Sequence, residues 1–150
     1  MNAFLNKKVT NLPVKEKKIR IKKRWFYYLV IEHEKEIVIQ QRTGKDIWNQ
    51  LYEFPMVEKE RETSFATILQ EAEKLGWLIK KKYEMVSVSP VFKQQLSHQL
   101  IAGQFIKINL QKKNTGATEV LWIKANQLKR FAFPKFINQY FDNRKEQTLF

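Results

Sequence analysis

Three side chains at helical spacing form a candidate position for a divalent cation. Gln70, Glu73 and Lys74 stand at positions i, i+3 and i+4 of a predicted helix, and such positions share one face. Three carboxylates there would offer Mg²⁺ the oxygen ligands that it requires. Here Glu73 is the one carboxylate, whereas Gln70 is an amide and Lys74 a cation. The three positions one residue further along are Glu71, Lys74 and Leu75, which also offer a single carboxylate. The sequence therefore predicts neither a metal site nor catalytic residues.

The charge of the chain is strongly basic and unevenly distributed. The net charge is +13, and residues 1–24 contribute nine Lys or Arg and a single Glu. Such an excess favours a polyanionic partner, because phosphates are attracted to it at long range. A solvated basic tail is the alternative. The candidate contacts to a DNA backbone are Lys18, Arg20, Lys22, Lys23 and Arg24.

Composition excludes several classes of protein. The chain of 150 residues is 43% hydrophobic and contains no cysteine, so one domain with a sizeable core is expected, without disulfides or cysteine-ligated metals. No apolar run reaches the length of a membrane span, and no secretory signal is present. These features are compatible with a cytosolic protein.

Strands and helices must position the candidate residues. Residues 1–18 read as a linker, and the folded part is expected over residues 19–150. The nearly continuous apolar run at 25–31 predicts a strand buried on both faces, which forms a hairpin with a strand at 36–42. Thr63 or Ser64 can cap a helix that ends before Gly76.

The second half of the chain is also predicted to contain strands first and helices last. A strand is expected at 80–89, and residues 92–110 alternate as two strands with a tight turn at Ser97 and His98. A turn at 114–116, a short strand at 119–123 and a short helix at 124–131 follow. Pro134 is placed to begin a final helix whose inward side chains are Phe136, Ile137, Tyr140 and Phe141.

Several sequence pieces match one family in order. They are RWFYYLVI, QQR, IWNQLYEFP, a helix ending in LG, FKQQLSHQL and FAFPKFINQYF. Together, over about residues 11–142, the chain resembles the C-terminal domain of the MutY family of adenine DNA glycosylases. The resemblance implies an α+β, Nudix-like fold, in which a mixed β-sheet is flanked by helices as an α/β/α sandwich. Residues 1–18 would then be a basic interdomain linker.

The resemblance also implies a function and partners. A glycosylase of this family flips adenine out of the duplex and hydrolyses its glycosidic bond, while this domain reads 8-oxoguanine on the opposite strand. The implied partners are double-stranded DNA with an 8-oxoguanine:adenine mispair and an N-terminal catalytic domain, which would hold the iron–sulfur cluster. No cofactor is expected in this chain. A monomer in the bacterial cytoplasm, associated with the nucleoid, is expected.

Four residues align with the segment of the family that contacts the lesion. Oxidation at C8 turns N7 of guanine from an acceptor into a donor, and a serine hydroxyl can accept or donate. Ser97 and His98 align with the family serine and histidine. Leu96 replaces an aromatic residue and can wedge between bases but cannot stack on them. Gln94 replaces an upstream histidine and keeps hydrogen bonding without a titratable charge.

Two other functions stay open on the sequence. A Mg²⁺-dependent Nudix nucleotide hydrolase would use the helix with Glu53 and Glu73, although solvated or ion-paired surface carboxylates are the simpler interpretation. The other hypothesis is a domain that only binds other proteins. The segment from Trp48 to Tyr52 is expected to pack in the core beside the helix, and His33 is expected in a turn.

Overall fold

The computed structural model describes the backbone of residues 20–113 and 119–148, and the side chains of these residues as far as residue 143. The expected linker at 1–18, with Lys18, and the expected turn at 114–116 lie outside the described residues. No helix among the described residues is long and apolar enough to cross a membrane.

Two long parallel strands form the centre of a mixed sheet, which has eight strands within residues 20–113 and 119–148. β2 (Lys22–His33) and β8 (Gln99–Leu110) pair in parallel along most of their length, from Lys22 beside Gln99 to Glu32 beside Asn109. The strands that pair with them or extend the sheet, all antiparallel to their partners, are β3 (Glu36–Gln41), β4 (Tyr52–Glu53), β5 (Met56–Lys59), β6 (Tyr83–Val88), β7 (Phe92–Leu96) and β9 (Leu121–Lys124).

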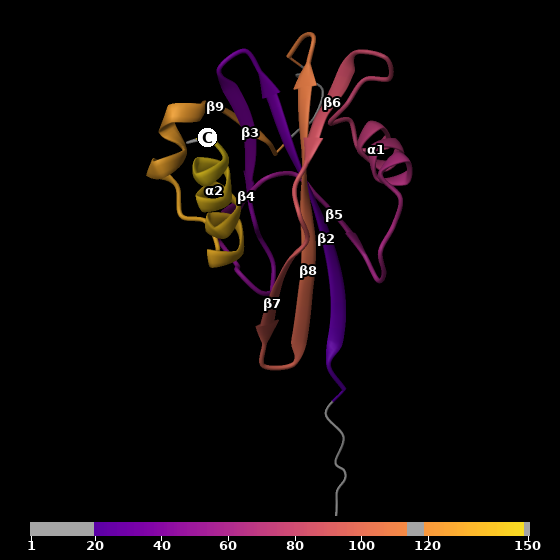
Figure 1. Cartoon of the computed structure of the whole chain (residues 1–150), viewed down its shortest axis with the longest axis vertical. Helices are drawn as coiled ribbons and strands as arrows, with labels where there is room; N and C mark the ends of the chain where they lie inside the picture. The colour runs from indigo at the N-terminus through magenta and orange to yellow at the C-terminus, as the bar shows by residue number, and fades with distance from the viewer. Residues whose placement is uncertain (1–19, 114–118, 149–150) are drawn as a thin grey trace, which may run out of the picture.

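Helices cover both faces of this sheet. α1 (Phe65–Lys74) lies on one side, and η1 (Ala125–Arg130) with α2 (Lys135–Thr148) lies on the other (Figure 1). Residues 26–31 of β2 are all buried because both faces of the strand are covered. The predicted sheet with flanking helices, and the strand buried on both faces, are confirmed.

Two separate hydrophobic cores result from this layering. One holds Tyr27, Leu29 and Ile68 under α1, and the other holds Phe26, Tyr28 and residues of α2. The inward face of α2 is confirmed, since Phe136, Ile137 and Tyr140 are buried and Phe141 is half-buried.

The boundaries of α1 follow the predicted signals. The Ser64 hydroxyl accepts a hydrogen bond from the Thr67 amide at 3.3 Å, which satisfies one of the free amides of the first turn. Gly76 follows the helix at φ 86°, a conformation that glycine adopts without strain. The predicted strand at 80–89 starts later than expected, at Tyr83, because Lys81 adopts a left-handed conformation in a turn.

Gly103 in β8 allows α2 to approach the sheet closely. A Cβ atom at this position would lie 2.8 Å from the backbone oxygen of Phe26 and 2.9 Å from the ring of Phe136. The ring of Phe136 therefore rests on the bare backbone of the central strand.

Two expectations about packing were wrong in location. Trp48 and Tyr52 pack against the core under α2 and not beside α1, with the Trp48 ring 5.9 Å from the rings of both Phe26 and Phe136. Glu53 is not a surface carboxylate, since only 4% of it is exposed. Trp48 lies in the irregular segment between β3 and β4, where its left-handed conformation is found, whereas Glu53 lies in β4 and pairs with Gln40 of β3.

Candidate nucleic-acid interface

The predicted tight turn forms one tip of the molecule. Ser97 and His98 are exposed and connect β7 to β8, as the sequence pattern indicated. The Lys22 amide donates to the His98 carbonyl at 2.9 Å, so the start of β2 is fixed to this turn. Figure 1 shows the turn and the start of β2 at the same end of the sheet. We call these two segments the tip.

The two other residues of the predicted reading segment lie behind the turn. Leu96 is half-buried and packs against the core under α2. Gln94 is half-buried as well, and its Oε1 is buried without a hydrogen-bond partner among the described residues. An unpaired buried acceptor is costly, so Gln94 Oε1 has an unmet capacity to accept a hydrogen bond. Neither side chain stands at the apex, where Ser97 and His98 are.

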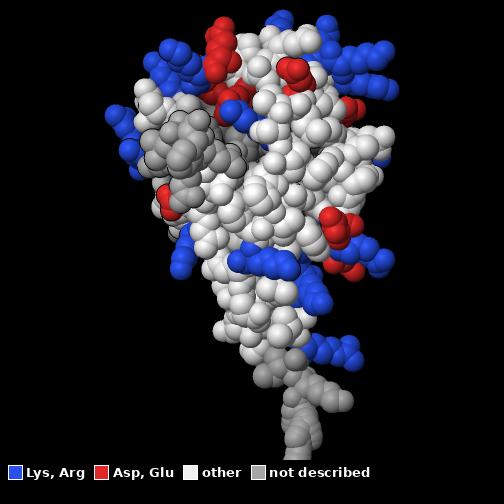
Figure 2. Space-filling view, in the orientation of Figure 1, with Lys and Arg blue, Asp and Glu red and all other residues white. Residues whose placement is uncertain are grey.

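The basic residues gather beside the tip. Arg20, Lys22 and Lys23 are exposed and lie at the start of β2. In Figure 2 the tapered lower end carries blue and white atoms, whereas red atoms lie above it. The tip thus combines exposed polar side chains with positive charges that form no ion pair among the described residues, a combination suited to a phosphate backbone.

Arg24 requires a correction, because its guanidinium is not available to a phosphate. The residue is 6% exposed and all five of its N–H donors are used. Two go to the Glu58 carboxylate at 2.7 and 2.8 Å, two to the Asp46 carboxylate at 2.9 and 3.0 Å, and one to Gln99 Oε1 at 2.9 Å. The cation also lies 4.9 Å from the centre of the Phe26 ring. Arg24 is a structural residue that was predicted as a contact.

The network around Arg24 changes the acidity of its members. Hydrogen bonds from the Arg24 guanidinium lower the pKa of Asp46 from 3.8 to about 2. The hydrogen bonds that Arg24 donates to Glu58, and then those to Asp46, raise the pKa of Arg24 above its ordinary value. Arg42 extends the network, since it donates to Asp46 at 2.9 Å and to Glu53 at 2.8 Å. These ion pairs were not predicted from the sequence.

On the face of α1 that would hold a metal, the one carboxylate is bonded to another side chain. Glu73 accepts a hydrogen bond from the Tyr83 hydroxyl at 2.6 Å, and burial with this bond raises the pKa of Tyr83 to about 12. Gln70 and Lys74 are exposed beside it. Among residues 20–113 and 119–148, no group of three or more His, Cys, Asp or Glu side chains is placed to hold a metal ion.

Glu53 and Glu73 do not form a carboxylate pair. Glu53 is bonded to Arg42 and, at 3.0 Å, to the Gln40 amide, whereas Glu73 is bonded to Tyr83. Burial raises the pKa of Glu53, and Arg42 opposes this shift. Each carboxylate is engaged with a different partner, which argues against a shared acid–base role. His33 ends β2 beside the turn, and its Nδ1 lies 3.0 Å from the Leu110 oxygen.

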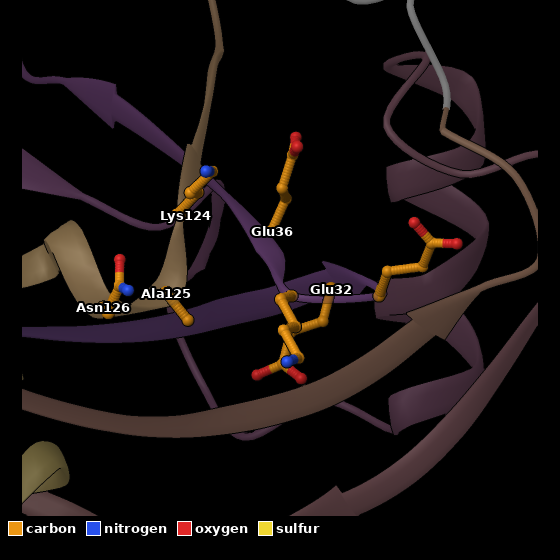
Figure 3. Close-up of a pocket in the computed structure, with 7 residues that line it drawn as sticks. Glu32, Glu36, Lys124, Ala125 and Asn126 are labelled. Carbon is orange, nitrogen blue, oxygen red and sulfur yellow. The ribbon is translucent and has the colours of Figure 1, made fainter.

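Two pockets lie outside the turn at Ser97 and His98. One of about 730 Å³ lies where β2 ends, opposite the tip; Figure 3 shows Glu36 and Lys124 on neighbouring strands, with Asn126 at the start of η1. Its lining mixes carboxylates with lysines, and Glu36 pairs with Lys113. A second pocket, of about 470 Å³, is lined by Arg42, Glu53 and neighbours. Neither pocket contains any of the residues predicted for lesion reading.

A mixed sheet with helices on both faces, and a helix after the first hairpins that ends in Leu-Gly, defines the Nudix fold. A family model described as "NUDIX domain" matches residues 26–143, and the chain belongs to this family. Among curated proteins, none matches the chain by sequence.

Solved structures agree on the fold. The C-terminal domain of mouse MUTYH, in complex with human PCNA, aligns with a TM-score of 0.60 at 15% identity and covers 81% of this chain and 90% of the mouse chain. RenU, a Nudix hydrolase from M. smegmatis, aligns with a TM-score of 0.62 at 11% identity and covers 83% of this chain and 86% of its own. The Ap4A hydrolase of C. elegans aligns with a TM-score of 0.61 at 12% identity and covers 86% of this chain and 98% of its own. These similarities establish a shared fold.

Proposed function

We propose that this chain is a DNA lesion-recognition domain that reads 8-oxoguanine opposite adenine. In this proposal a separate catalytic domain, which would carry the iron–sulfur cluster, excises the adenine. The observation that carries the proposal is the tip, where exposed Ser97 and His98 lie against the basic start of β2. The ordered sequence resemblance to the MutY family, and the fold shared with the mouse MUTYH domain, support it.

The chemistry of the tip fits the lesion. The oxidised base presents an N–H at N7, and the Ser97 hydroxyl can accept from it. Neighbouring Lys22 and Lys23 can hold the phosphate backbone, which positions the duplex without reading its sequence. The tip therefore offers both kinds of contact that lesion recognition requires.

A further support is the small number of carboxylates on this face of α1. With an amide at 70 and a cation at 74, Glu73 is the one carboxylate of the three positions, and it is bonded to Tyr83. A Mg²⁺ site needs several oxygen ligands. The scaffold is therefore better suited to binding than to phosphate hydrolysis.

The proposal is tested by titrating the full chain with two duplexes that differ only at the lesion. One contains 8-oxoguanine opposite adenine, and the other contains guanine opposite cytosine. We expect tighter binding of the first and amide NMR shifts centred on Ser97 and His98. Ser97→Ala should weaken binding of the lesion duplex about two- to ten-fold, the equivalent of one hydrogen bond. Ser87→Ala, an exposed serine on β6, is the matched control and should change nothing.

The outcome against the proposal is equally concrete. Equal affinity for both duplexes, with no shift near Ser97, would leave lesion reading without support.

The mouse MUTYH domain is bound to PCNA in its structure. A repair-protein partner is therefore a further possibility for this chain, separate from the DNA contact.

A Mg²⁺-dependent Nudix nucleotide hydrolase is the alternative, since hydrolases share the fold. Incubation with Mg²⁺ and a panel of nucleoside triphosphates decides between them. We expect no turnover. Mg²⁺-dependent turnover that Glu73→Gln abolishes would establish the hydrolase instead.

A further inference from the structure

The loop that joins β3 to β4 is built as a rigid element. Three of its residues adopt left-handed backbone conformations: Gly44 at φ 93°, Trp48 at 57° and Gln50 at 70°. For residues other than glycine this conformation persists only where the surroundings enforce it. The loop, residues 43–50, is therefore held in one shape, and we call it the Gly44 loop.

Hydrogen bonds across the base of the Gly44 loop supply this enforcement. The Arg42 amide donates to the Leu51 oxygen and the Gln50 amide to the Arg42 oxygen, each at 2.8 Å. The Arg42 guanidinium donates to the Ile47 oxygen at 3.1 Å, and Asp46 caps the Ile47 amide at 2.7 Å. Closed in this way, the loop can present a side chain at a fixed place.

The Gly44 loop is also joined to the tip. Because β3 runs antiparallel to β2, it ends toward the tip, and the loop continues in that direction (Figure 1). One nitrogen of Arg24, Nη1, donates both to Asp46 of the loop and to Gln99, the first residue after the turn. The buried guanidinium of Arg24 thus connects the loop to the end of the turn through one hydrogen bond on each side.

One cation on the Gly44 loop has no ion-pair partner in the part of the chain that the structure describes. Lys45 is exposed and makes no ion pair within the described residues. The adjacent Asp46 accepts hydrogen bonds from both Arg24 and Arg42, so its charge is already engaged. Lys45 therefore carries free positive charge on the same end of the molecule as Lys22.

We propose that the Gly44 loop is a second DNA-contacting element of the tip, with Lys45 as a contact to a backbone phosphate. This inference rests on the proposed function, because it names a second place where the same duplex is held. A lysine on a pre-shaped loop loses less freedom on binding than one on a flexible tail, since the backbone is already fixed.

Salt dependence tests the inference, because each lost phosphate contact reduces the slope of log K against log [salt] by about 0.9. Lys45→Gln and Lys35→Gln remove the same charge from exposed positions at opposite ends of the sheet. We measure both in the full chain with the duplex containing 8-oxoguanine opposite adenine, and Lys22→Gln serves as a reference at the tip. Thermal unfolding confirms that the variants are folded.

The expected result is a slope reduced by about 0.9 for Lys45→Gln and Lys22→Gln, with Lys35→Gln equal to the parent. If Lys22→Gln lowers the slope while Lys45→Gln behaves like Lys35→Gln, the Gly44 loop is not a contact and the inference alone fails. Equal reductions in all three variants would indicate a general charge effect and also overturn it. If the parent chain does not bind the duplex, the proposed function itself fails.

Discussion

Replacing Arg24 by methionine is the perturbation whose size the structure determines most directly. The substitution keeps an unbranched side chain in a buried place but removes five hydrogen bonds, four of them to carboxylates. Breaking a fully buried ion pair costs about 3–5 kcal/mol because a charge is left unpaired. Here the side chains of Asp46 and Glu58 are 39% and 38% exposed, so water can rehydrate them. We therefore expect a loss of about 2–3 kcal/mol in the free energy of unfolding.

Urea and thermal unfolding measure this loss. For a chain of this length it corresponds to a fall in Tm of about 4–12 °C. Arg61→Met, at an exposed arginine, is the matched control and should stay within about 0.5 kcal/mol of the parent. A loss below about 0.5 kcal/mol for Arg24→Met would refute the reasoning that the guanidinium holds the three segments together. A loss as large for Arg61→Met would show that the assay reports charge alone.

Three further results are expected. The double change Gln70→Glu with Lys74→Glu should create a Mg²⁺ site on α1, seen as broadening of nearby amide signals by Mn²⁺ that the parent chain does not show. The pKa of Asp46 is lowered from 3.8 to about 2 in the folded state, so its stabilising contribution is present above about pH 4 and is lost as the pH falls toward 2; Asp46→Asn should flatten that part of a plot of Tm against pH. Gly103→Ala should cost about 1–3 kcal/mol in urea unfolding, because the new methyl group would overlap the ring of Phe136.

Periodicity predicted the elements but not which charges are buried. The apolar run of β2, the caps of α1 and the turn at Ser97 and His98 are local signals, and each was found where the sequence placed it. Arg24 was assigned to the surface because it stands in a basic run. Successive side chains of a strand alternate between its two faces, so Arg24 lies on the same face as Phe26, two residues further along. This alternation was the signal in the sequence that could have predicted its burial.

The partners of Arg24 could not be inferred in the same way. Asp46, Glu58 and Gln99 come from three segments that are far apart in the sequence, and only the assembled sheet brings them to one guanidinium. The position of Trp48 was missed for a related reason. Its left-handed conformation depends on the closure of the loop, and propensity does not predict such conformations in residues other than glycine.

The parallel pairing of β2 with β8 has a consequence for attached domains. Since β2 begins at the end where the turn lies, any polypeptide joined upstream of residue 20 is delivered to that same end. A module tethered there would search a small volume around a ligand held at that end instead of the whole solution, which raises its effective concentration. The length of the tether, more than the affinity of either module, would then govern how often both engage one site.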